Sequence, residues 1–104
     1  MNFFAAFLLA GFLLSHLAGC VTAPPPMEDY VLAEAAINAA KKVEASRHSA
    51  GYFRKAELAY KKAQQLLEER EYQAAQDEFR KAREAAERAE NSARLIRFKN
   101  GEVL

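Results

Sequence analysis

The chain has 104 residues, of which 15 are Lys or Arg and 14 are Asp or Glu, and its formal net charge is +1. This length allows one domain at most, and the near-neutral balance excludes the strongly basic field typical of nucleic-acid-binding proteins. The single cysteine, Cys20, excludes an intramolecular disulfide. All charged side chains follow Cys20. The segment before Cys20 therefore suits an apolar environment, and the remainder suits water.

The N-terminal segment is apolar from Phe3 to Leu14. A membrane-spanning helix needs ~20 apolar residues, so this shorter run is typical of the core of a signal peptide. Small residues then precede Cys20, and we predict a signal peptide over 1–19 that is cleaved between Gly19 and Cys20. A positive n-region is missing, so either the true start lies upstream or this signal tolerates an uncharged beginning. A short buried helix with an incidental cysteine is the alternative interpretation.

Leu17-Ala18-Gly19-Cys20 resembles, residue for residue, the lipobox of bacterial lipoproteins. The resemblance implies that the Cys20 sulfur receives a diacylglyceryl group and that the new amino group is acylated. Two or three acyl chains would anchor the protein stably, whereas one would not. In such lipoproteins an Asp after the cysteine commonly signals retention in the inner membrane. Val21 stands there, so the resemblance implies the outer membrane, with the protein facing the periplasm.

A Pro-rich tether is expected over 20–26, since Pro24 to Pro26 favour polyproline II. At ~3.1 Å per residue the segment from Val21 reaches about 20 Å, which keeps the following domain close to the membrane. The domain itself is expected over 27–104. Its content of Ala, Glu, Lys, Arg and Leu is typical of helices and coiled coils.

Three helices are predicted, over about 28–47, 52–69 and 71–98. In each of them small and apolar residues recur at steps of three and four, which places them on one helix face. The stripe of the first helix is Ala33, Ala36, Ile37, Ala40 and Val43; that of the second is Phe53, Ala56, Ala59, Tyr60, Ala63, Leu66 and Leu67; and that of the third is Tyr72, Ala75, Phe79, Ala82, Ala86, Ala89, Ala93 and Ile96.

The boundaries differ in how clearly they are marked. Ser49 and Gly51 punctuate the end of the first pattern, and Asn100-Gly101 provides a stop after the third. Residues 68–71 contain neither Gly nor Pro, so an unbroken helix over 52–98 is the rival interpretation.

Short connections make consecutive helices antiparallel, so the expected fold is all-α: an up-down-up three-helix bundle or antiparallel coiled coil. The third helix, at ~28 residues, spans ~42 Å and the second, at ~18 residues, only ~27 Å. We therefore expect the end of the third helix to overhang, pointing away from the membrane. The candidate partner surface at this end consists of Arg94, Leu95, Ile96, Arg97, Phe98 and Lys99. The basic residues there suit either an acidic partner or the negative end of the helix dipole.

Two further resemblances come from the helices. The segment 59–82 is similar to one tetratricopeptide repeat, although Glu87 stands where the repeat has its closing proline; its matching residues are Ala63, Tyr72, Ala75, Phe79 and Ala82. One copy implies a helical hairpin of that packing type, because an array needs about three. The domain also resembles short, Ala-rich bacterial outer-membrane lipoproteins with a helical domain of unknown function, through 33–40, Ala56-Glu57-Leu58-Ala59, Glu71-Tyr72-Gln73-Ala74-Ala75 and 82–93.

Catalytic, cofactor-binding and metal-binding residues are not expected. His48 is the only histidine after the signal peptide, and without a second His or a free Cys it has no evident partner for a metal. The serines have no base and orienting carboxylate at a recognisable spacing. The many carboxylates alternate with Lys and Arg as on a solvated helix face, and Asp77–Lys81 and Glu84–Arg88 stand at the i,i+4 spacing of ion pairs.

We therefore expect a non-enzymatic, membrane-anchored periplasmic lipoprotein that acts as a structural or adaptor module for another cell-envelope protein. The regular stripes also permit a homo-oligomer. The alternative is a coiled-coil spacer associated with peptidoglycan, similar to the Braun-type lipoproteins. That family attaches through a C-terminal Lys, whereas this sequence ends in Glu102-Val103-Leu104.

Overall fold

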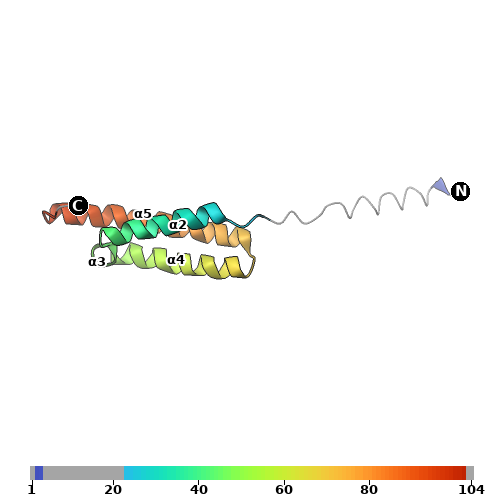
Figure 1. The fold of residues 1–104 in the computed structure, drawn as a ribbon, viewed down its shortest axis with the longest axis horizontal. Coiled ribbons are helices and arrows are strands. Elements are labelled where there is room, and N and C mark those ends of the chain that lie inside the picture. Colours follow the sequence, from blue (N-terminus) through green and yellow to red (C-terminus); the bar gives the residue numbers. More distant parts are fainter. Residues whose placement is uncertain (1, 4–22, 103–104) are drawn as a thin grey trace.

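The structure, a computed structural model, describes residues 2–3 and 23–102, and its ordered elements are helices packed against each other (Figure 1). They are α2 (Met27–Lys42), α3 (Ala45–His48), α4 (Ala50–Glu68) and α5 (Tyr72–Lys99). The predicted all-helical class and the helical bundle are confirmed. The predicted lipidation and cleavage residues, Gly19 and Cys20, lie outside the described residues.

The three long helices alternate in direction. In Figure 1, α2 runs from residues 23–26 toward α3, α4 returns, and α5 runs outward again along the whole bundle. Helix α5 packs against both α2 and α4, while α2 and α4 contact each other much less. The long third helix is therefore the element on which the other two are assembled. We call the end of the bundle at α3 and the last turn of α5 the distal end.

The first helix is shorter than predicted. The sequence predicted one helix over 28–47, but α2 ends at Lys42, and Glu44 has a left-handed backbone with φ of 57°. Val43 and Ala45 are both buried in the same core cluster. Residues two apart lie on opposite sides of a continuous helix, so the chain turns at Glu44 to bury both of them. The four residues of α3 follow this turn.

The start of the next helix also differs from the prediction. Helix α4 begins at Ala50 and not at 52, so Gly51 is its second residue and does not interrupt it. Ser49 precedes the helix and is buried, with no side-chain capping hydrogen bond.

A turn separates α4 from α5, and the rival interpretation of one continuous helix is wrong. Arg70 adopts a left-handed φ of 61°. Its N–H donates to the carbonyl of Leu67 at 3.1 Å, and the N–H of Glu71 donates to that of Leu66 at 2.9 Å. This is the Schellman pattern of helix ends, formed here with an arginine in the place usually held by glycine.

The core consists of two clusters along the bundle, and most of their members are alanines, which allow the helices to approach closely. The distal cluster contains Ile37, Ala40, Val43, Ala45, Phe53, Ala56, Ala85, Ala86, Ala89 and Ala93. The cluster nearer the tether contains Ala33, Ala63, Ala75, Phe79 and Ala82, with Tyr30, Ala59, Tyr60, Leu66 and Leu67 partly buried around them. Ala85 is the one α5 member that the predicted stripe lacked.

Candidate partner-binding surface at the distal end

The predicted partner surface lies on the last two turns of α5, and the structure leaves two of its apolar side chains uncovered. Leu95 is 54% exposed and Phe98 is 73% exposed, whereas Ile96 is half-buried. Helix α5 extends past α3 in Figure 1, as the difference in helix length suggested. The exposed apolar part of this surface is therefore made by Leu95 and Phe98.

The end of α5 is closed by a second Schellman pattern. Gly101 has a φ of 75°. Its N–H donates to the carbonyl of Phe98 at 3.0 Å, and the N–H of Glu102 donates to that of Arg97 at 2.9 Å. The predicted stop at Asn100-Gly101 thus turns the chain back and brings Glu102 beside α5 and α3.

The basic side chains of this surface are mostly paired with carboxylates. Arg94 donates from Nε and Nη2 to Oε1 of Glu90, at 3.1 and 2.9 Å. Arg97 donates from Nε to Oε2 of Glu102 at 2.7 Å, and its side chain is only 16% exposed. The distal end is therefore less basic toward a partner than Arg94, Arg97 and Lys99 suggest in the sequence.

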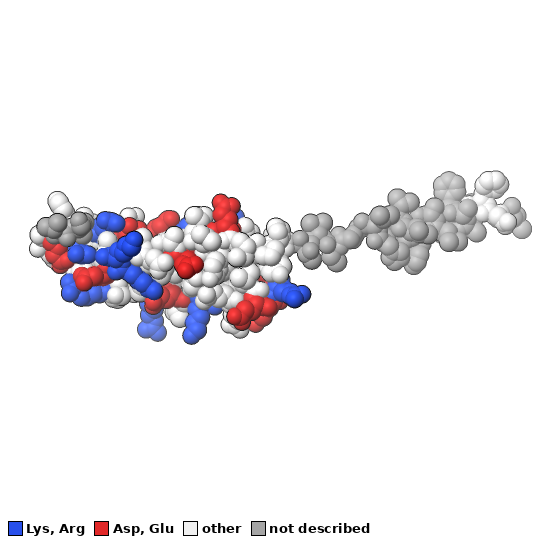
Figure 2. All heavy atoms as spheres, in the orientation of Figure 1, with Lys and Arg blue, Asp and Glu red and all other residues white. Residues whose placement is uncertain are grey.

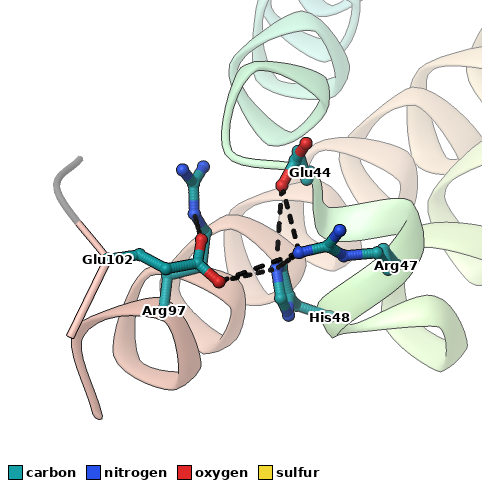
Figure 3. A network of polar contacts seen from close by, with 5 residues as sticks. All are labelled: Glu44, Arg47, His48, Arg97 and Glu102. Atoms are coloured by element: carbon teal, nitrogen blue, oxygen red, sulfur yellow. Dashed lines mark hydrogen bonds and ion pairs between the residues drawn. The ribbon is translucent and has the colours of Figure 1, made fainter. Parts of the chain in front are cut away.

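A polar network joins the segment after α5 to α3 and the preceding turn (Figure 3). Glu102 Oε1 lies 3.7 Å from Arg47 Nη2 and 3.9 Å from His48 Nε2. Glu44 Oε2 lies 3.6 and 3.8 Å from the same two nitrogen atoms. Arg97 holds the other oxygen of Glu102. Glu102 is far from His48 in the sequence and approaches it only in the folded bundle, so the sequence shows no such partner; the Glu44–His48 spacing of four is the one signal that it contains.

A second exposed apolar area, which was not predicted from the sequence, lies on α2 near the tether. Its largest members are Met27, Val31 and Leu32, and Val31 is 58% exposed. Figure 2 shows an uncharged area over this part of α2, while charged side chains crowd toward the distal end. Uncovered apolar side chains thus lie at both ends of the bundle, and Tyr52 and Leu58 of α4 are exposed as well.

The surface carboxylates pair with cations in a different pattern from the one predicted. Lys81 Nζ lies 2.9 Å from Oε1 of Glu78, three residues earlier, so its ion pair is with Glu78. This ion pair raises the pKa of Lys81 above its ordinary value. Two Arg–Glu pairs at the i,i+4 spacing are Arg83–Glu87 at 3.8 Å and Arg94–Glu90 at 2.9 Å.

Comparison with known proteins adds no assignment, since no protein-family model, curated protein or solved structure matches the chain. Among the described helices, none combines the length and apolar character that crossing a membrane requires. The class defined by the structure is an all-helical bundle.

Proposed function

We propose that this protein is a lipid-anchored adaptor of the bacterial cell envelope, which binds a partner protein through Leu95 and Phe98 at the distal end. The lipobox-like Leu17-Ala18-Gly19-Cys20 supports the anchor, and Val21 after it supports the outer membrane, facing the periplasm. The observation that carries the adaptor role is the exposure of Leu95 and Phe98, 54% and 73%, at the end opposite the tether.

The position of these residues suits a partner that approaches from the periplasm. A tether of about 20 Å keeps the near end of the bundle at the membrane. Helix α5 has 28 residues and so carries its distal end about 42 Å along the bundle. Here exposed apolar side chains are surrounded by ion-paired arginines, which is typical of a protein-binding patch. In such a patch the apolar contacts supply affinity and the polar rim supplies orientation.

The experiment is site-specific photo-crosslinking in cells, with the crosslinking residue at 98, at 95, and at 31 as the matched control. Val31 is 58% exposed, as accessible as Leu95, but lies at the tether end. We expect one discrete adduct from positions 95 and 98 and not from 31. The same adduct should be lost when Cys20→Ser removes the anchor. Equal labelling from all three positions, or none from 95 and 98, would rule out the distal surface.

A spacer between outer membrane and peptidoglycan is the second candidate, and the long α5 favours it. A single 28-residue helix that runs the length of the bundle is a suitable strut. This candidate predicts that lysozyme digestion of isolated envelopes releases the chain with a muropeptide attached or changes its fractionation. The adaptor proposal predicts identical mass and fractionation with and without lysozyme.

A further inference from the structure

Three potential metal ligands from separate segments converge at the distal end. They are a carboxylate oxygen of Glu44 in the turn after α2, Nε2 of His48 in α3, and a carboxylate oxygen of Glu102 after α5, and all lie within 4.8 Å of one another. His48 Nε2 is 3.8 Å from Glu44 Oε2 and 3.9 Å from Glu102 Oε1. Figure 3 shows the imidazole and both carboxylates directed toward the same point.

The imidazole is the most enclosed member of the group, with a side-chain exposure of 10%, compared with 52% for Glu44 and 32% for Glu102. Its Nε2 contacts Arg47 Nη2 at 3.1 Å. In the tautomer that has its proton on Nδ1, Nε2 presents a lone pair at this contact. An imidazole nitrogen with a free lone pair is the form that binds a metal ion.

A positive group already lies close to all three donors. Arg47 Nη2 lies 3.1 Å from His48 Nε2, 3.6 Å from Glu44 Oε2 and 3.7 Å from Glu102 Oε1. The Arg47 side chain is 66% exposed. Ion pairs this long and this exposed contribute little to stability, so the guanidinium can move into solvent at small cost.

We propose that Glu44, His48 and Glu102 bind a divalent transition-metal ion of the zinc class, which replaces the guanidinium of Arg47. Zn²⁺ takes imidazole nitrogen and carboxylate oxygen at about 2.0–2.2 Å, which sets tetrahedral ligands about 3.3–3.6 Å apart. The two separations from His48, 3.8 and 3.9 Å, are close to this range, and the three donor atoms, which lie within 4.8 Å of one another, would draw together around the ion. Water completes the coordination. Ca²⁺ and Mg²⁺ prefer oxygen ligands alone and fit this set less well.

Arg97 supports the arrangement from outside. Its Nε holds Glu102 Oε2 at 2.7 Å, which leaves Oε1 directed toward His48. A hydrogen bond of this kind orients a ligating carboxylate. Glu44 lies in the turn between α2 and α3, and Glu102 lies after α5. A bound ion would therefore join these two segments. This inference is independent of the lipid anchor and of the apolar partner surface, and it departs from the sequence expectation of no metal.

The test is calorimetric titration of ZnCl₂ into the full chain in detergent, carrying Cys20→Ser and His16→Ala so that no thiol or second imidazole competes. We expect one Zn²⁺ per chain and no comparable heat with CaCl₂. His48→Ala and Glu102→Gln should each weaken binding by more than the roughly 10- to 100-fold that follows the loss of an outer-shell partner. Glu90→Gln, which removes a carboxylate ion-paired elsewhere on α5, is the matched control and should leave binding unchanged.

Arg47→Ala distinguishes a metal site from a structural ion-pair network. If the guanidinium competes with the ion for the three donors, its removal tightens Zn²⁺ binding, although it removes two ion pairs from the network. Circular dichroism of each variant without metal checks that the bundle is folded. Binding unaffected by His48→Ala in a folded protein, or weakened by Arg47→Ala, would overturn the proposal.

Discussion

The ring of Tyr30 in α2 meets the ring of Phe79 in α5 nearly edge-on, with centroids 5.3 Å apart and planes inclined at 84°. Tyr60 of α4 completes the contact, 5.8 Å from Phe79 and 6.0 Å from Tyr30. Each long helix thus contributes one aromatic ring to the same point of the core. Edge-to-face pairs of this kind stabilise beyond the area that they bury. In a core built mostly of alanine, these rings are among the few bulky side chains.

Phe79→Ala is expected to destabilise the bundle strongly. Among the residues that the structure describes, Phe79 is the largest wholly buried side chain, and truncating such a phenylalanine to alanine costs about 3–5 kcal/mol through lost burial and the cavity left behind. Phe79→Leu should cost less than about 1.5 kcal/mol. Phe98→Ala, at a position 73% exposed, should lie within about 0.5 kcal/mol of the parent. Urea unfolding followed by circular dichroism measures all three, and equal effects at 79 and 98 would contradict this core.

Alkaline pH should destabilise the bundle through Tyr60. Burial, aided by the neighbouring Tyr30 and the charge of Glu34, raises the pKa of the Tyr60 hydroxyl well above its ordinary value. The folded protein therefore keeps a proton that the unfolded chain releases near pH 10. The contribution of the protonated Tyr60 to the free energy of unfolding is fully present below pH 10. It is lost as the pH rises further, by at most about 1.4 kcal/mol per pH unit. Tyr60→Phe should unfold with a shallower dependence between pH 10 and 11.5; identical slopes would contradict it.

Arg70→Gly should stabilise the turn between α4 and α5. Arg70 has a left-handed φ of 61°, a conformation that costs residues with a Cβ about 1–2 kcal/mol and glycine nothing. After the larger entropy of glycine in the unfolded chain is subtracted, a net gain of about 0.5–1 kcal/mol remains. Arg54→Gly, the same substitution inside α4, should instead cost about 1 kcal/mol. A loss of stability in Arg70→Gly, measured by urea unfolding, would show that the arginine side chain itself holds the turn.

The sequence predicted the parts of this fold that depend on local periodicity. The stripes on α4 and α5 follow from steps of three and four, and Gly101 marks the end of α5 because a left-handed residue there favours glycine. The turns at Glu44 and Arg70 could not be predicted in this way, since both are left-handed without glycine. At Glu44 the burial of Val43 and Ala45 outweighs local preference, whereas Glu69 and Glu71 on either side of Arg70 are exposed.

The two candidate sites also differ in how far the sequence predicts them. Exposure of Leu95 and Phe98 follows from the length of α5 and from their position off the buried stripe, which the sequence contains. The approach of Glu102 to His48 depends on where α5 ends relative to α3, and that relation exists only in the folded bundle. A metal site formed by residues so far apart in the sequence cannot be predicted from the spacing of a motif.

The most direct test of the account is the intact mass of the protein extracted from cell membranes with detergent. The account predicts a chain that begins at Cys20, lacks residues 1–19 and carries the added mass of a diacylglyceryl group and an amide-linked acyl chain, while a Cys20→Ala variant retains its N-terminal residues and carries no lipid. A full-length chain that still bears Met1 and an unmodified Cys20 thiol would contradict it.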